Sequence, residues 1–374
     1  MTPNSAGRID GIDFWRGFAL LTIFINHLPT NVFQYVTHKN FGLSDAAELF
    51  VFLSGVSIAV AYGAKFFAGD RGKAVKAVLR RAFTLYWVQA LIALLSIAMF
   101  AAAAQWWDND DLVDDEARDL VVSEPGKGIL AILMLGHQFE NINILPMYIV
   151  LLLFTPVLLV LARRDDRLML LASATIYAVA RVFDLNVPNW PLDGGWYFNP
   201  LAWQLLFAIG LFVGRRIRGN GIGYDRRVFV ACCGLLAASA FVVTDGFGFV
   251  PALWQDARGF IDHDKNNLGI FRLAHFLALA YVIRHSGLTD VLRRTLAFAP
   301  LALIGRHSLP VFATGTVLAG LGEVIVETRP EEFTHQIALG TAIVCGGILV
   351  HYAVARLFAA RAGARRAAAL VAAP

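Results

Sequence analysis

One apolar stretch, DFWRGFALLTIFINHLP, carries Asp13, Arg16 and His27 among hydrophobic residues. At 100° per residue these three side chains share one face of a helix, and Asn26 and Pro29 would make its His27 end irregular. An ionisable group inside an apolar helix is costly, and imidazole is the natural proton carrier near neutral pH. We therefore predict that His27 is a general base, with a hydrogen-bonded structural histidine as the alternative.

A pair of carboxylates lies in the stretch SDAAELFVFLSG, where Asp45 and Glu48 are three residues apart. That spacing puts both on one helix face, at the depth expected for His27. A carboxylate beside an imidazole fixes its tautomer and raises its basicity, so we predict that Asp45 and Glu48 are catalytic together with His27. The alternative for Asp45 is a helix-capping acid, since it follows Ser44 at a helix start.

Further polar residues occur in GHQFENINILPMY, NPLAWQ and KNNLGIFRLAH, each next to an apolar run. We expect them to line one outer pocket that binds substrate. The alternatives without a binding role are a hydrophilic loop, an interfacial tryptophan, and lysine or arginine side chains that reach toward the membrane surface. The predicted substrate-binding residues are Asn26, His137, Glu140, Asn143, Trp203, Gln204, Lys265, Arg272 and His275.

A second, basic group is expected on the opposite, inner face, where the sequence reads IGRHSLPVF. Its side chains would form a positive mouth; for the basic 71–81 loop, the alternative is positive-inside topology together with attraction to anionic lipids. The group comprises Arg16, Arg80, Arg81, Arg306, His307 and Ser308.

The elements that must position these groups are membrane helices. Of the 374 residues, 57% are hydrophobic and only 16% are charged, against about 25% charged in a typical soluble domain. With a mean hydropathy of +0.60, the composition excludes a soluble enzyme and a disordered chain, and a net charge of +4 makes nucleic-acid binding improbable. We predict an all-α polytopic membrane protein, a single domain over residues 1–374, with a short re-entrant or interfacial helix near 128–136.

About ten transmembrane helices follow from runs of roughly 20 apolar residues. They lie near residues 14–34, 45–67, 80–104, 143–163, 168–183, 197–215, 227–245, 268–285, 299–323 and 334–358.

Basic residues concentrate in alternate loops between these spans, and the positive-inside rule makes those loops cytoplasmic. Both termini are then cytoplasmic as well. Cys232, Cys233 and Cys345 lie in apolar stretches without metal-ligand spacing, so we expect buried, inert thiols and no metal site. The basic loops are 71–81, 163–167, 215–227, 284–294 and 361–366.

Several of these motifs together resemble a known family. DFWRG, the NHLP that ends the first span, THKNFGLSDAAELFVFLSG, NILPMY, LGIFRLAHF and IGRHSL are similar to the OpgC family, over about residues 8–356. Its members are integral-membrane succinyltransferases of osmoregulated periplasmic glucans, within the superfamily of transmembrane acyltransferases. Asn26 departs from the family pattern, in which an acidic residue often precedes the histidine.

The resemblance implies acyl transfer from cytoplasmic succinyl-CoA to a hydroxyl of a periplasmic glucan, in a bacterial inner membrane. It assigns the general base to His27 and the phosphates of CoA to the basic inner group, while Arg272 could pair with the succinyl carboxylate. No permanently bound cofactor is implied, and glucan-synthesis proteins are plausible partners besides the surrounding lipids. The alternatives are the same fold acetylating another glycan, a glycan or anion transporter, and a non-catalytic scaffold.

Overall fold

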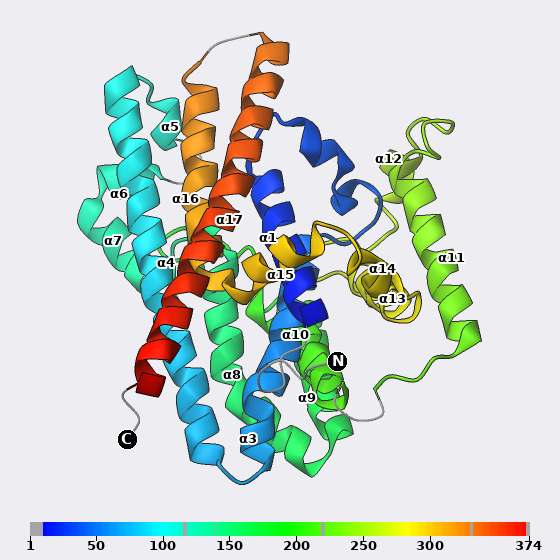
Figure 1. Cartoon of the computed structure of the whole chain (residues 1–374). Helices are drawn as coiled ribbons and strands as arrows, with labels where there is room; N and C mark the ends of the chain where they lie inside the picture. The colour runs from blue at the N-terminus through cyan, green and yellow to red at the C-terminus, as the bar shows by residue number, and fades with distance from the viewer. Residues whose placement is uncertain (1–9, 115–117, 139, 218–220, 330–331, 372–374) are drawn as a thin grey trace. The chain divides into compact units, whose positions relative to one another are not determined.

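A computed structural model describes residues 10–114, 118–138, 140–217, 221–329 and 332–371. These residues form helices joined by turns and loops, without a β-strand among them, as the composition predicts (Figure 1). The chain divides into two compact units, which are treated separately. The larger unit is His38–Ser286, and the smaller unit combines Met1–Thr37 with Gly287–Pro374.

The larger unit is built on long apolar helices. Helix α2 packs closely on α10, because a Cβ added at Gly55 would lie 2.2 Å from the Phe207 carbonyl oxygen. Helix α2 continues through a π-helical turn, Ala59–Gly63, into α3. The main helices are α2 (Ala46–Ile58), α3 (Ala64–Phe67), α4 (Arg71–Trp107), α8 (Ile144–Arg164), α9 (Asp166–Val182), α10 (Pro200–Arg216), α11 (Arg226–Val243) and α13 (Ile270–His285).

Short helices in the same unit occupy the connections. Helix α7 (Pro125–Leu133) has an apolar face and covers most of the predicted short helix near 128–136. The others are the 3₁₀ turns His38–Asn40 and Glu140–Ile142, and the helices α5 (Asp111–Asp114), α6 (Asp119–Ser123) and α12 (Leu253–Ala257).

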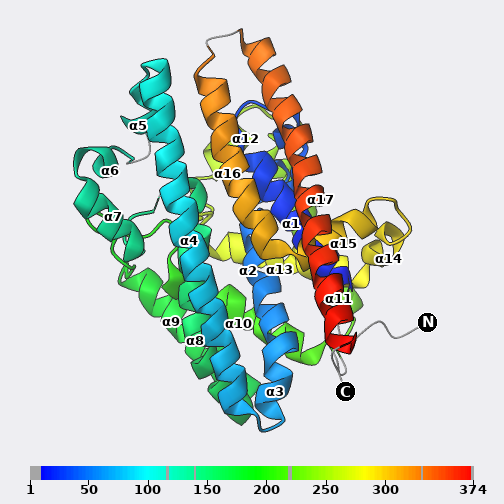
Figure 2. The same cartoon turned by 60° about the vertical axis from the view of Figure 1, so that its left-hand side comes forward.

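The smaller unit pairs α1 (Asp10–His27) with α15 (Phe298–Arg306). The two backbones meet at glycine, since a Cβ at Gly17 would lie 2.0 Å from the Leu301 carbonyl oxygen. Helices α16 and α17 run side by side in both views (Figures 1 and 2). The remaining elements are the 3₁₀ turn Val32–Val36, α14 (Leu288–Leu292), α16 (Ser308–Glu327) and α17 (Phe333–Val371).

Two predicted span boundaries are wrong, and proline explains both. The first span was expected to reach residue 34, but α1 ends at His27, because the residue before Pro29 disfavours helical dihedrals. The side-chain amide of Asn31 then caps the carbonyl of Leu28 at 2.8 Å. The predicted span 299–323 is broken at His307 (φ −109°), and Pro310 falls in the first turn of the new helix, where its missing N–H costs nothing.

Among the residues that the structure describes, six segments are long and apolar enough to cross a membrane, which indicates a membrane protein. The structure does not confirm ten spans: α1, α9, α10 and α13 are helical at predicted positions, but each is either too short or too charged to qualify by length and composition. The six segments are Ala46–Phe67, Arg71–Trp107, Ile144–Arg164, Arg226–Val243, Ser308–Glu327 and Phe333–Arg365.

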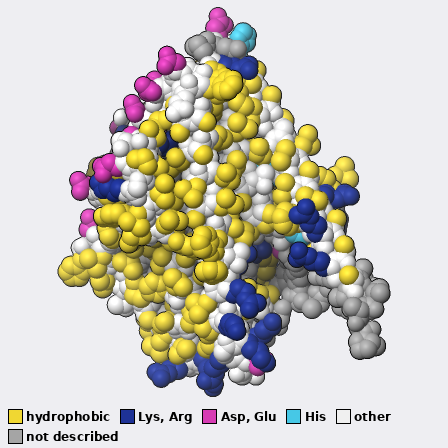
Figure 3. Space-filling view, turned by 90° about the vertical axis from the view of Figure 1, so that its left-hand side faces the viewer, with side chains coloured by type: hydrophobic (Ala, Val, Ile, Leu, Met, Phe, Trp, Pro, Cys, Tyr) yellow, Lys and Arg dark blue, Asp and Glu magenta, His cyan; other side chains and the backbone are white. Residues whose placement is uncertain are grey.

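The outer surface of α4 suits contact with lipid. Phe83, Trp87 and Leu91 are each more than half exposed along this helix. Basic residues begin the helix at Arg71, and acidic residues follow its end from Asp108. Figure 3 shows hydrophobic side chains across this face, with Lys and Arg gathered toward one edge and Asp and Glu toward the other. The basic start of α4 belongs to one of the alternate basic loops from which the orientation was predicted.

Candidate functional site

A cluster of four charged side chains lies where α2 and α13 begin in the larger unit. Arg272 on α13 donates from Nε to Glu48 Oε1 at 2.7 Å, and its Nη2 lies 3.2 Å from Asp45 Oδ2. Lys265, in the loop before α13, is 2.7 Å from the same Asp45 oxygen. The Glu48 side chain is fully buried, and that of Arg272 is only 11% exposed. Two carboxylates are therefore paired with two cations, and the Arg272–Glu48 pair is the buried part of the cluster.

Asp45 also begins α2. Its Oδ1 accepts from the Ala47 N–H at 2.8 Å, and Glu48 Oε2 accepts from the Asp45 N–H at 2.8 Å, which together make a capping box. This confirms the capping alternative for Asp45. Both carboxylates thus have structural partners, and the orientation of His27 by either of them stays a prediction.

The cluster sets the ionisation of its loop members. Burial alone would raise the pKa of the Asp45 carboxyl, but the positive charges of Lys265 and Arg272 outweigh burial and hold that pKa below its ordinary value. Burial alone would lower the pKa of Lys265. The effect of the Asp45 carboxylate is larger than that of burial, so the pKa of Lys265 is raised. Both groups are consequently charged at neutral pH.

His275 lies one turn beyond Arg272 and is buried. Its Nδ1 is 2.8 Å from the Ser44 hydroxyl, and a Cβ at Gly42 would lie 2.3 Å from its Nε2. His38 approaches the same loop, where burial lowers its pKa and Asp45 opposes that shift only in part. The predicted residues Asp45, Glu48, Lys265 and His275 are therefore brought together with Arg272, and His38 joins a group from which it was missing.

Three other predicted substrate-binding residues are buried, and two of them have structural partners. Trp203 is fully buried, and its indole N–H points to the carbonyls of Lys265 and Asn266 at 3.2 Å, so it cannot stack on a sugar in this structure. Both ends of the Gln204 amide bond to Ser173, which ties α10 to α9. Asn143 is buried at the start of α8.

The remaining predicted residues of the larger unit lie after α7 and on α4. His137 is buried directly after α7, whereas the side chain of Glu140 is outside the described part of the structure. Arg80 and Arg81 lie on α4, where Arg80 is exposed and Arg81 half-buried.

In the smaller unit, His27 is the last residue of α1 and is half-buried. The preceding Asn26 accepts at Oδ1 from the Thr37 hydroxyl at 3.0 Å. Because Oδ1 of Asn26 accepts this hydrogen bond, the Nδ2 group is the donor of the same side chain. A histidine at an irregular, polar helix end was the sequence prediction, and the local structure matches it.

The basic residues of the smaller unit surround Asp13. Arg16 Nη1 is 3.6 Å from Asp13 Oδ1, and Arg306 Nε is 3.4 Å from Asp13 Oδ2. Asp13 is buried, while the Arg306 side chain is 44% exposed. His307 and Ser308 are half-buried at the break between α15 and α16. The Arg306 side chain is therefore partly open to solvent.

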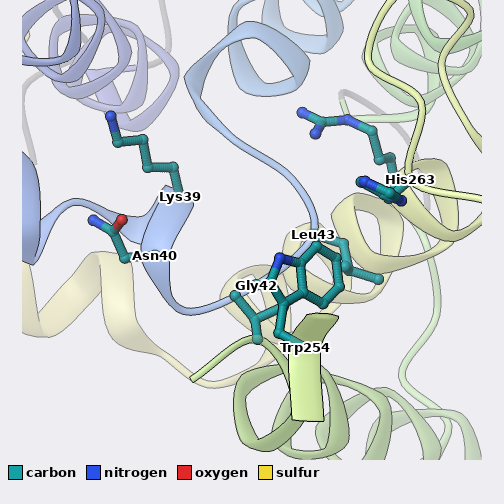
Figure 4. Close-up of a pocket in the computed structure, with 8 residues that line it drawn as sticks. Lys39, Asn40, Gly42, Leu43, Trp254 and His263 are labelled. Carbon is teal, nitrogen blue, oxygen red and sulfur yellow. The ribbon is translucent and has the colours of Figure 1, made fainter. Parts of the chain in front are cut away.

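Sequence reasoning missed a cavity of about 320 Å³ beside the charged cluster. Figure 4 shows Lys39 and Asn40 on one side of it, His263 on the other, and Trp254 next to Leu43. Arg272 also lines it. The motif THKNFGLSDAAE contained the signal for Lys39 and Asn40, but nothing nearby in sequence marked the residues from the 253–263 segment.

Sequence reasoning also missed His351, which is buried on the apolar helix α17. Its Nδ1 is 2.6 Å from the Gly347 carbonyl, and its ring centroid is 4.6 Å from that of Phe24. The i−4 carbonyl bond and the aromatic neighbour give it the role of a satisfied core histidine. Within the described ranges, no three His, Cys, Asp or Glu side chains are grouped to hold a metal ion.

Comparison with known families gives a match along nearly the whole chain. The profile of the OpgC protein family covers residues 8–362. The chain belongs to the OpgC family. No curated protein and no solved structure gave a match. Membership in the OpgC family suggests an acyltransferase role on glucans, and the apolar helices make this member a transmembrane one.

Proposed function

We propose that this protein is a transmembrane O-acyltransferase that moves a succinyl group from cytoplasmic succinyl-CoA to a hydroxyl of a periplasmic glucan. The OpgC family match over residues 8–362 carries the proposal. Support comes from His27 at a polar helix end, and from basic side chains around Asp13 and on α4 that suit the phosphates of CoA.

The proposed mechanism is direct transfer with His27 as general base. As the glucan hydroxyl oxygen attacks the thioester carbonyl carbon, the imidazole takes the hydroxyl proton. A C–O bond forms, and the negative charge moves to the carbonyl oxygen, where the Asn26 Nδ2 group is the proposed donor. The C–S bond then breaks, and the proton passes from the imidazolium to the departing thiolate, which leaves as CoA.

The proposed site places the donor and the acceptor on opposite sides of the membrane. The basic residues Arg16, Arg80, Arg81 and Arg306, with His307 and Ser308, would hold the donor from the cytoplasm. The proposed location is the bacterial inner membrane, as the family suggests, and the basic loops support cytoplasmic termini. Asp45 and Glu48 would act by holding Arg272 and Lys265 in place at the outer face.

The test is release of free CoA from succinyl-CoA by the detergent-purified protein, with and without a β-glucan acceptor. We expect release that depends on the glucan, and an ester-linked succinyl group on the recovered glucan by mass spectrometry. His27→Ala should abolish both. The matched control is His335→Ala, because His335 is an exposed histidine at the start of α17 in the same unit.

Full activity in His27→Ala at a normal protein level would overturn the assignment of the base. Transfer from acetyl-CoA alone would favour the related acetylating enzyme. The absence of release from any acyl-CoA would overturn acyl transfer and favour a transporter that uses the outer polar residues as a binding site.

A further inference from the structure

The cavity beside the charged cluster has a basic lining. Lys39, Arg272 and His263 contribute to its wall, together with the amide of Asn40, and no Asp or Glu of the described ranges lines it. Its volume of about 320 Å³ lies at the lower end of the range for small-molecule pockets. The cavity is therefore suited to a small ligand that carries negative charge.

A count of charges around the cavity leaves Lys39 in excess. Glu48 and Asp45 are taken by Arg272 and Lys265, at distances between 2.6 and 3.2 Å. Within the described part of the chain, no ion pair to Lys39 is formed. Three cations thus accompany two carboxylates, and Lys39, the third cation, is among the residues that line the cavity.

The neighbouring acidic residues are directed elsewhere. Asp262 pairs with Arg181 of α9 at 2.8 Å and accepts from the Ile270 N–H at 2.8 Å. Asp264 accepts from Asn267 Nδ2 at 3.0 Å and lies 4.0 Å from Arg181. Neither contributes to the cavity wall, so neither lies beside Lys39 on that wall.

The charge of Lys39 is maintained at a cost. Burial lowers its pKa, and attraction to Asp45 only partly opposes the effect. A carboxylate in the cavity would relieve this cost and would gain a charge-assisted hydrogen bond. Arg272, in contrast, could bind a ligand carboxylate only in competition with Glu48 and Asp45.

We propose that this cavity binds the free carboxylate of the dicarboxylic acyl group, with the Lys39 ammonium as its main partner. Trp254 and Leu43 supply the apolar surface for the two methylene groups, and Asn40 and His263 supply further polar contacts. The inference rests on the proposed function, because it assigns the succinyl specificity of that reaction to Lys39 and not to Arg272.

The test compares succinyl-CoA with butyryl-CoA, whose acyl chain has the same length but lacks the carboxylate. We expect Lys39→Met to lower the ratio of kcat/KM for succinyl over butyryl transfer by about tenfold or more, the value of one hydrogen bond to a charged group. Lys39→Arg should keep most of the ratio. The control is Lys127→Met, because Lys127 is an exposed lysine paired with Glu124 outside the cavity.

A binding measurement separates this inference from the proposed function. Monomethyl succinate should bind the purified protein by calorimetry, methyl butyrate should not, and Lys39→Met should lose the binding. If that pattern holds while no acyl-CoA is used, acyl transfer is wrong and the carboxylate site stands. If succinyl transfer occurs with an unchanged ratio in Lys39→Met, the carboxylate site is wrong and the proposed function stands.

Discussion

Replacement of Arg272 by methionine tests the charged cluster most directly. The guanidinium bonds to Glu48 at 2.7 Å and to Asp45 at 3.2 Å, and the Glu48 side chain is fully buried. Removal of one partner of a buried ion pair costs about 3–5 kcal/mol, because the other charge stays buried without compensation. In Arg272→Met, Asp45 is still paired with Lys265, but the only one of these contacts left to Glu48 is the hydrogen bond from the Asp45 N–H. We therefore expect a loss near the upper end of that range.

The expected loss can be read from thermal unfolding in detergent, followed by tryptophan fluorescence. At roughly 2–4 °C per kcal/mol for a unit of this size, a loss of about 4–5 kcal/mol should lower Tm by roughly 8–20 °C in Arg272→Met. Lys265→Met is the matched comparison. Its side chain is 33% exposed, and Asp45 would keep Arg272, so we expect a loss of about 1 kcal/mol or less.

A double variant guards against the trivial outcome in which Arg272→Met does not fold. Glu48→Gln with Arg272→Met removes both buried charges, so it should be more stable than Arg272→Met alone. If Arg272→Met is no less stable than Lys265→Met, or if the double variant is the least stable of the three, the reasoning about the cluster is refuted.

Three further predictions follow from single contacts. Asp45→Asn keeps a capping oxygen for the Ala47 N–H, so Asp45→Ala should be less stable than Asp45→Asn by about 1 kcal/mol in the same assay; equal stabilities would contradict the cap. Because the folded-state pKa of Asp45 is lowered, its contribution is complete above the unfolded value of about 4 and is lost as pH falls below it. Tm should therefore drop less between pH 5 and pH 3 in Asp45→Asn than in the wild type, by melting curves at each pH. Gly347→Ala should destabilise the smaller unit, because its Cβ would lie 2.2 Å from the Phe24 ring, whereas the adjacent Gly346→Ala meets nothing within 4 Å; equal melting temperatures would show that the ring yields.

Local sequence predicted the features that depend on neighbours along the chain. Apolar runs predicted the helices, since a helix satisfies its own backbone bonds. The Ser-Asp-x-x-Glu pattern predicted an acid at the start of α2, because capping involves only three or four consecutive residues. The ends of α1 and α15 were missed, although Pro29 and Pro310 carried the signal.

Tertiary structure decided which polar groups are already occupied. Arg272 is 224 residues from Glu48 along the chain. Nothing in the sequence pattern showed that Arg272 would pair with both Glu48 and Asp45, while Lys39 forms no such pair within the described residues. Gln204 and Trp203 were read as ligand contacts, yet they bond to Ser173 and to the Lys265–Asn266 loop. A buried polar group needs a hydrogen-bonding or charged partner. Several residues in the sequence could supply that partner, and only the packing of distant segments decides which of them does.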